Sequence, residues 1–114
     1  MPDADARALW RIRMVHTIAW AVFASSIVAI PLVVWIGSLR LALWLSVLVW
    51  VEVLILAANR LSCPLTAVAA RYTEDRSDNF DIFLPAWLAR HNKVIFGSLF
   101  AFGEIALTLR WALG

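Results

Sequence analysis

No aspartate, glutamate, lysine or arginine occurs between residues 14 and 39, and this uncharged run is the strongest constraint on the fold. A helix needs about 20 predominantly apolar residues to cross the roughly 30 Å of hydrocarbon in a bilayer. The run is longer than that, and also longer than the apolar part of a cleaved signal peptide, which has about 7–15 residues. We therefore predict a retained membrane-spanning helix over about residues 14–36.

Two further apolar segments follow. Residues 41–59 are interrupted only by Glu52, and residues 94–113 carry Glu104 inside and Arg110 near the end. Of the 114 residues, 63% are hydrophobic and 16% are charged, whereas about 25% are charged in a soluble domain. A soluble domain of this length would leave much of its apolar surface in water. The sequence therefore predicts an all-α integral membrane protein with three transmembrane helices.

The connection between the second and third spans, residues 60–93, has a different character. Its first part, residues 61–70, is apolar but too short to cross a bilayer. A polar stretch over residues 71–81 is typical of a surface loop, and residues 82–89 are apolar again. We predict a cytoplasmic, interfacial amphipathic segment here, within a single membrane domain formed by residues 1–114.

Arginine and lysine are distributed unequally over the predicted loops. One side of the membrane would hold Arg7, Arg11, Arg13, Arg60, Arg71, Arg76, Arg90 and Lys93, and the other Arg40 and Arg110. Because short cytoplasmic loops are enriched in positive residues, we place the N-terminus in the cytoplasm and the C-terminus across a bacterial inner membrane. The expected partners of these basic residues are anionic lipid headgroups, not nucleic acid.

Polar side chains within the spans form the first candidate site. Counted from the predicted cytoplasmic ends, Ser25, Glu52 and Glu104 lie at similar depths near the middle of the bilayer, with the adjacent Ser26 as an alternative to Ser25. Carboxyl groups inside a membrane usually face the interior of a helix bundle. Two of them close together would retain a proton and form a proton relay or a cation site. Alternatively, they form hydrogen bonds between helices or contacts with a partner subunit.

Small residues mark two helix faces that permit close packing. On the first span Thr17, Ala21, Ser25 and Ala29 repeat every four residues, and on the third Gly97 and Ala101 share a face with Glu104. Because these two spans run in the same direction, Ala21 and Ala101 could meet at the same depth.

Histidine and cysteine offer a second candidate site. His16, Asn59, Cys63 and His91 all fall at the predicted cytoplasmic edge. Their spacing matches no metal-binding pattern, so we predict neither a metal nor a cofactor, and haem ligation by His16 and His91 is the single exception that we consider. No catalytic motif surrounds Cys63, and no catalytic residue is assigned.

Residues Cys63, Pro64, Leu65 and Thr66 form a Cys-Pro-Leu-Thr motif. With it, the sequence resembles a family of small uncharacterised bacterial inner-membrane proteins, a domain-of-unknown-function group that carries this motif after a second membrane span containing a glutamate. His16, Glu52 and residues 80–84 look like the counterparts of other family features. The resemblance implies membrane class and topology, but no activity. Independently of it, Pro64 suits the first turn of a short helix and Thr66 its cap.

The function that these observations favour is that of a small non-enzymatic protein, an accessory or structural subunit of a larger membrane complex. Three helices bury little surface among themselves, so the small-residue faces suit contact with other membrane subunits or with copies of the same chain. The alternative is a small oligomeric proton or cation carrier that uses Glu52 and Glu104.

Overall fold

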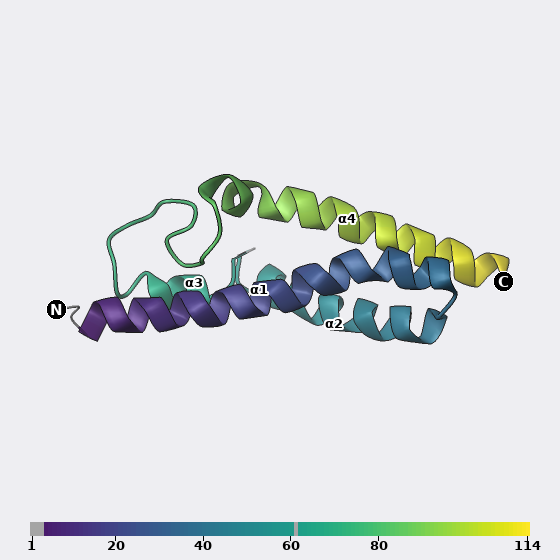
Figure 1. Cartoon of the computed structure of the whole chain (residues 1–114), viewed down its shortest axis with the longest axis horizontal. Coiled ribbons are helices and arrows are strands. Elements are labelled where there is room, and N and C mark those ends of the chain that lie inside the picture. The colour runs from purple at the N-terminus through teal and green to yellow at the C-terminus, as the bar shows by residue number, and fades with distance from the viewer. Residues whose placement is uncertain (1–3, 61) are drawn as a thin grey trace. The chain divides into compact units, whose positions relative to one another are not determined.

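The computed structural model describes residues 4–60 and 62–114, and its regular elements are helices (Figure 1). In chain order they are α1 (Ala4–Ile36), α2 (Leu39–Ala58), α3 (Pro64–Ala69) and α4 (Ala86–Leu113). The three long helices α1, α2 and α4 are each apolar enough to cross a membrane. This confirms the prediction of an all-α chain with three candidate spans and a short helical piece between the second and the third.

Two of the long helices begin earlier in the chain than the apolar runs predict. Helix α1 starts at Ala4, with Asp5 in its first turn, where a negative charge stabilises the end of the helix. Helix α4 starts at Ala86, directly after Pro85, whose carbonyl accepts a hydrogen bond from the Ala89 amide at 2.9 Å. Residues 86–93, predicted as part of the interfacial segment, therefore belong to the same helix as the third span.

The turn between α1 and α2 occurs at Gly37, where the sequence predicts a break. Gly37 has a φ angle of 99°, which a residue without a β-carbon adopts at little cost. Its amide lies 3.1 Å and 3.0 Å from the carbonyl oxygens of Val33 and Val34, and the Ser38 amide donates to Val33 at 3.2 Å. These bonds satisfy carbonyls that the end of a helix otherwise leaves unpaired, so α2 follows directly.

The chain divides into two compact units. The first, which we call the loop unit, contains residues 4–21, 55–60 and 62–91 of the part that the structure describes, including α3 and the segment that follows it. The second, which we call the three-helix unit, contains residues 22–54 and 92–114.

The three-helix unit has an apolar interior to which α1, α2 and α4 all contribute. Ile30 and Val49 have the largest fully buried side chains, and Phe100 and Leu107 of α4 pack into the same cluster. Gly103 allows the closest approach, because a β-carbon added there would lie 3.1 Å from Cγ2 of Ile30. The close packing of α4 against α1 in this unit therefore depends on the absence of a side chain at Gly103.

The loop unit has a partly polar interior. Its buried residues include Ala69 of α3 and the neighbouring pair Asp81 and Ile82. Pro64 is the first residue of α3, as its fixed φ angle predicts, but the predicted cap is wrong. Cys63 occupies the N-cap position without a side-chain hydrogen bond, and the hydroxyl group of Thr66 is bonded to Asp81 instead.

Candidate functional site

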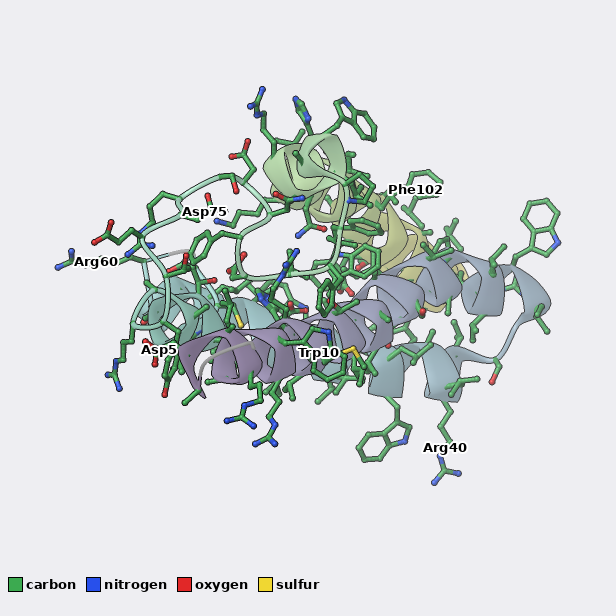
Figure 2. All side chains as sticks on the ribbon, turned by 60° about the vertical axis from the view of Figure 1, so that its left-hand side comes forward. Asp5, Trp10, Arg40, Arg60, Asp75 and Phe102 are labelled. Carbon is green, nitrogen blue, oxygen red and sulfur yellow. The ribbon has the colours of Figure 1, made fainter. Side chains whose placement is uncertain are left out.

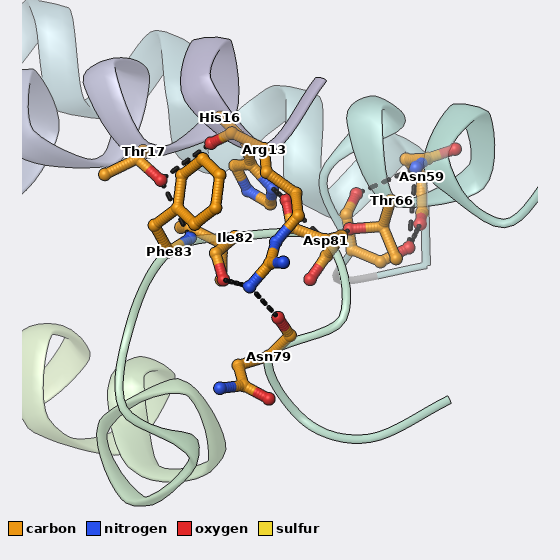
Figure 3. Close-up of polar contacts among 10 residues, drawn as sticks. Arg13, His16, Thr17, Asn59, Thr66, Asn79, Asp81, Ile82 and Phe83 are labelled. Atoms are coloured by element: carbon orange, nitrogen blue, oxygen red, sulfur yellow. Dashed lines mark hydrogen bonds and ion pairs between the residues drawn. The ribbon is translucent and has the colours of Figure 1, made fainter. Parts of the chain in front are cut away.

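Asp81 is the centre of a polar network inside the loop unit (Figure 3). Asp81 is only 6% exposed, although the polar sequence around it is typical of a surface loop. Its carboxylate accepts a hydrogen bond from the hydroxyl group of Thr66, and Oδ2 lies 3.6 Å from Nδ1 of His16. The backbone oxygen of Asp81 lies 3.0 Å from the same histidine nitrogen. One buried residue therefore connects α1, α3 and the loop.

Two further side chains of α1 hold the loop in place (Figure 3). The Arg13 guanidinium donates to the backbone oxygens of Asn79 and Ile82 at 3.4 Å and 3.3 Å, and it lies 4.3 Å from the centre of the Phe83 ring. The Thr17 hydroxyl accepts a hydrogen bond from the Phe83 amide at 2.9 Å. The loop backbone therefore finds hydrogen-bond partners on α1, as buried peptide groups require.

Cys63 is a half-buried free thiol that shares a hydrogen bond with His16. Burial acts to raise the pKa of this thiol, and the negative charge of Asp81 acts in the same direction. The hydrogen bond and positive charge of His16, together with a backbone hydrogen bond at Leu65, outweigh both and hold the pKa of Cys63 below its ordinary value. The site therefore favours the thiolate, which is the nucleophilic form of cysteine.

The tautomer of His16 follows from its contact with Asp81. A carbonyl oxygen only accepts hydrogen bonds, so Nδ1 must carry the proton that it donates to the Asp81 backbone. Nε2 of neutral His16 is then the nitrogen able to take up a proton. This order of groups, a carboxylate beside an imidazole beside a thiol, orients and activates nucleophilic cysteines in general. Sequence reasoning named His16 and Cys63 together, but it missed Asp81 and Arg13.

The hydroxyl group of Thr66 provides a test of the network. We expect Thr66→Val, which keeps the shape of the side chain, to leave the buried carboxylate of Asp81 without this donor at a cost of about 1–2 kcal/mol. Exchange of the Phe83 amide hydrogen should then accelerate about five- to thirtyfold. The matched control is Thr73→Val, because the Thr73 hydroxyl group accepts an exposed bond from the Asp75 amide. Equal acceleration in both variants would contradict a specific role for Thr66.

His91 lies in a different environment from His16. Its Nδ1 is 2.9 Å from the backbone oxygen of Trp87, one turn earlier in α4, and its ring lies against the Trp87 ring. Across residues 4–60 and 62–114, no group of three histidine, cysteine, aspartate or glutamate residues is placed to hold a metal ion. Of the two haem ligands considered from sequence, His16 contacts Asp81 in the loop, and His91 contacts Trp87 in its own helix.

Within the three-helix unit, Glu104 of α4 and Ser46 of α2 are in polar contact. The Ser46 hydroxyl donates to Oε1 of Glu104 at 2.5 Å, and Ser46 is buried. Glu52 lies six residues further along α2, which corresponds to about 9 Å along the axis and about 120° around it. Ser25 is exposed, whereas the adjacent Ser26 is buried and donates to the Val22 backbone. Of the predicted polar layer, Glu104 thus pairs with a serine that the sequence did not single out.

The small residues predicted for helix packing lie mostly on exposed surfaces. Ala21, Gly97 and Ala101 are exposed, and Ala29 is half-buried. Outside its own helix and chain neighbours, no heavy atom of the described residues lies within 4 Å of a β-carbon added at Gly97. The close contact of α4 with α1 is made instead at Gly103, against Ile30 and Pro31.

Comparison with known proteins returned no match to a family model, to a curated protein or to a solved structure. The resemblance carried by residues 63–66 stays a prediction from sequence.

Proposed function

We propose that this protein is a non-enzymatic accessory or structural subunit of a larger membrane complex. Its three candidate spans place most of the chain in contact with lipid or with other membrane helices. The partner subunit would contact the face of α4 that contains Gly97 and Ala101.

The observation that carries the proposal is the exposed pair Gly97 and Ala101. These residues are one helical turn apart on α4, and space around Gly97 is open. Helices in membranes associate mainly by close packing, and small residues four positions apart are a common means of achieving it. Because the packing of α4 within the chain uses Gly103, the face of Gly97 and Ala101 is available to a helix of another subunit.

The pairing of Glu104 also supports a structural role over ion transport. A carrier built on Glu52 and Glu104 would bring the two carboxyl groups to one site, where each alters the proton affinity of the other. Glu104 is instead bonded to Ser46, and Glu52 is rotated by about 120° from Ser46 around α2. A carboxyl group bonded to a hydroxyl group on the neighbouring helix fastens two helices together.

The test is the mass of the native particle extracted in mild detergent from the source membrane. We expect an assembly much larger than the 12.8 kDa chain, and we expect Gly97→Leu to release the chain from it. Ser98→Leu is the matched control, because Ser98 is also exposed and lies about 100° around the same helix. Recovery of the lone wild-type chain, or equal loss of the assembly in both variants, would overturn the proposal.

The contact between His16 and Cys63 favours a second role, that of a regulated thiol. In this role the Cys63 thiolate attacks one sulfur of a low-molecular-weight disulfide. A new sulfur–sulfur bond forms, the old one breaks, and the leaving thiolate takes up a proton. The chain has one cysteine, so the product is a mixed disulfide that no second thiol of the chain resolves. The dependence of Cys63 reactivity on His16 tests this role.

A further inference from the structure

An open apolar groove lies within the three-helix unit between the last turns of α1 and α4. It has a volume of about 1020 Å³ and is lined by residues that include Pro31, Leu32 and Trp35 of α1 and Phe102, Leu109 and Leu113 of α4. The two helices are in close contact at Gly103, where a β-carbon would lie 3.3 Å from Cδ of Pro31. Bulky side chains of both helices line the groove beyond this contact, and the groove is open to the surroundings.

The lining is strongly apolar and open to the surroundings. Trp35 is 87% exposed and Leu113 is 85% exposed, and Phe102 and Leu109 are also more than half exposed. Figure 2 shows Phe102 projecting from α4. In a candidate membrane span, such a surface faces hydrocarbon, and a groove of this volume is within the range of specific ligand sites.

Arg110 gives one end of the groove a positive charge. It lies in the last turn of α4, and its guanidinium reaches toward the turn at Gly37, within 3.6 Å of where a β-carbon would lie. In the described part of the chain, the ion pairs join His16 to Asp81 and Arg90 to Asp78, and neither includes Arg110. An arginine at the end of a membrane span is stable when its charge reaches the headgroup region and meets an anion there.

We propose that this groove binds an anionic phospholipid, with an acyl chain along the apolar lining and the headgroup phosphate on Arg110. The guanidinium group forms two parallel hydrogen bonds to a phosphate group. A zwitterionic headgroup has no net charge, so it attracts the guanidinium group less strongly than an anionic headgroup does. The apolar lining suits the hydrocarbon of an acyl chain.

A second copy of the chain fits the groove less well than a lipid does. Residues 14–51 and 105–114 contain no aspartate or glutamate. A parallel copy with its ends level would therefore bring no side-chain carboxylate to Arg110, and burial of a guanidinium group without such a partner is costly. A lipid phosphate supplies a counter-ion.

The experiment is a lipid titration of the delipidated full chain, followed by native mass spectrometry in mild detergent. The probes are phosphatidylglycerol and phosphatidylcholine with the same acyl chains. We expect the wild type to prefer phosphatidylglycerol by about tenfold or more, Arg110→Gln to lose this preference, and Arg110→Lys to keep part of it. Arg40→Gln is the matched control, since Arg40 is exposed and extends away from α2 (Figure 2).

A second variant separates loss of the site from loss of the fold. Leu113→Glu places a carboxylate one turn from Arg110 at an exposed position, so it should abolish the preference for phosphatidylglycerol. Thr108→Glu should retain the preference, because Thr108 is exposed, lies about 200° around α4 from Arg110 and does not line the groove. The proposal is overturned if the wild type binds both lipids equally, if Arg40→Gln loses the preference as Arg110→Gln does, or if Leu113→Glu keeps it. A lipid-free dimer that depends on Arg110 would overturn it in favour of a second copy.

Discussion

Gly103→Leu is expected to destabilise the three-helix unit by about 3 kcal/mol, the upper part of the range for an overpacked core. Even the first added carbon would lie 3.1 Å from Cγ2 of Ile30 and 3.3 Å from Cδ of Pro31. Ile30 is fully buried and is therefore poorly able to move aside, and the proline ring is rigid. Helix α4 must then move away from α1, which opens the cluster around Val49 and Leu107. The measurement is reversible unfolding in detergent, followed by loss of helical circular dichroism.

Gly97→Leu is the matched control for this prediction. It is the same substitution in the same helix, but the space around Gly97 is open. Both variants gain about the same helix propensity from the loss of a glycine, so the difference between their unfolding free energies measures overpacking alone. We expect Gly97→Leu to leave the unfolding free energy of the isolated chain unchanged or slightly raised. Equal destabilisation by the two substitutions would show that α1 and α4 do not meet at Gly103.

The number and order of the spans could be predicted because each follows from a local property. An uncharged run long enough to cross a bilayer is visible in the sequence, and Gly37 marks the turn between two such runs through its positive φ angle. The starts of α1 and α4 are less well predicted, since hydropathy describes the lipid-facing part of a helix and not its polar extension. Alanine, leucine and arginine continue α1 back to Ala4 outside any apolar run.

Helix rotation is what hydropathy leaves undetermined. The spacing of Gly97 and Ala101 correctly identifies a face of small residues, but it does not say whether that face meets α1 or an exterior surface. Gly103 lies two positions after Ala101, about 200° around the helix, and is the residue in contact. The hydrophobic pattern gives little help, because a membrane helix is apolar on all sides.

Ser46 illustrates how the choice of origin affects an estimate of depth. Glu104 and Glu52 appear level when both are counted from the predicted cytoplasmic ends. Counted from the other end of the helices, Glu104 is nine residues before the end of α4 and Ser46 is seven residues after the start of α2. That count places them within about 3 Å of the same depth. A search for hydroxyl groups level with each carboxyl group would have found this pair.

The polar network of the loop unit could be predicted only in part. His16 and Cys63 stand out because they are reactive residue types near one predicted edge of the membrane. Asp81 does not, since it is one of several acidic residues in a polar stretch, and its contact with His16 joins positions 65 residues apart. No local pattern reports a contact of that range. Only the folded loop shows which of these carboxylates is buried.

We expect His16→Ala to slow the alkylation of Cys63 by iodoacetamide about tenfold at pH 7. The hydrogen bond and charge of His16 lower the pKa of Cys63 against the opposing effect of burial. At a pH below the thiol pKa, the fraction of thiolate falls tenfold for each unit by which the pKa rises. Loss of His16 should therefore move the whole pH–rate profile toward higher pH, and the two rates should converge in alkali, where both thiols are ionised.

His91→Ala is the control for this experiment, because the His91 ring nitrogen contacts the backbone oxygen of Trp87 in the same helix and not Cys63. Its profile should coincide with that of the wild type. A His16→Ala profile that also coincides would show that the imidazole does not activate the thiol, and the regulated-thiol role would then be withdrawn. A shift confined to His16→Ala supports an activated thiolate, since a thiol that is merely more accessible would react faster at every pH without a change in the midpoint of the profile. The position of the midpoint, and not the rate alone, therefore distinguishes activation from exposure.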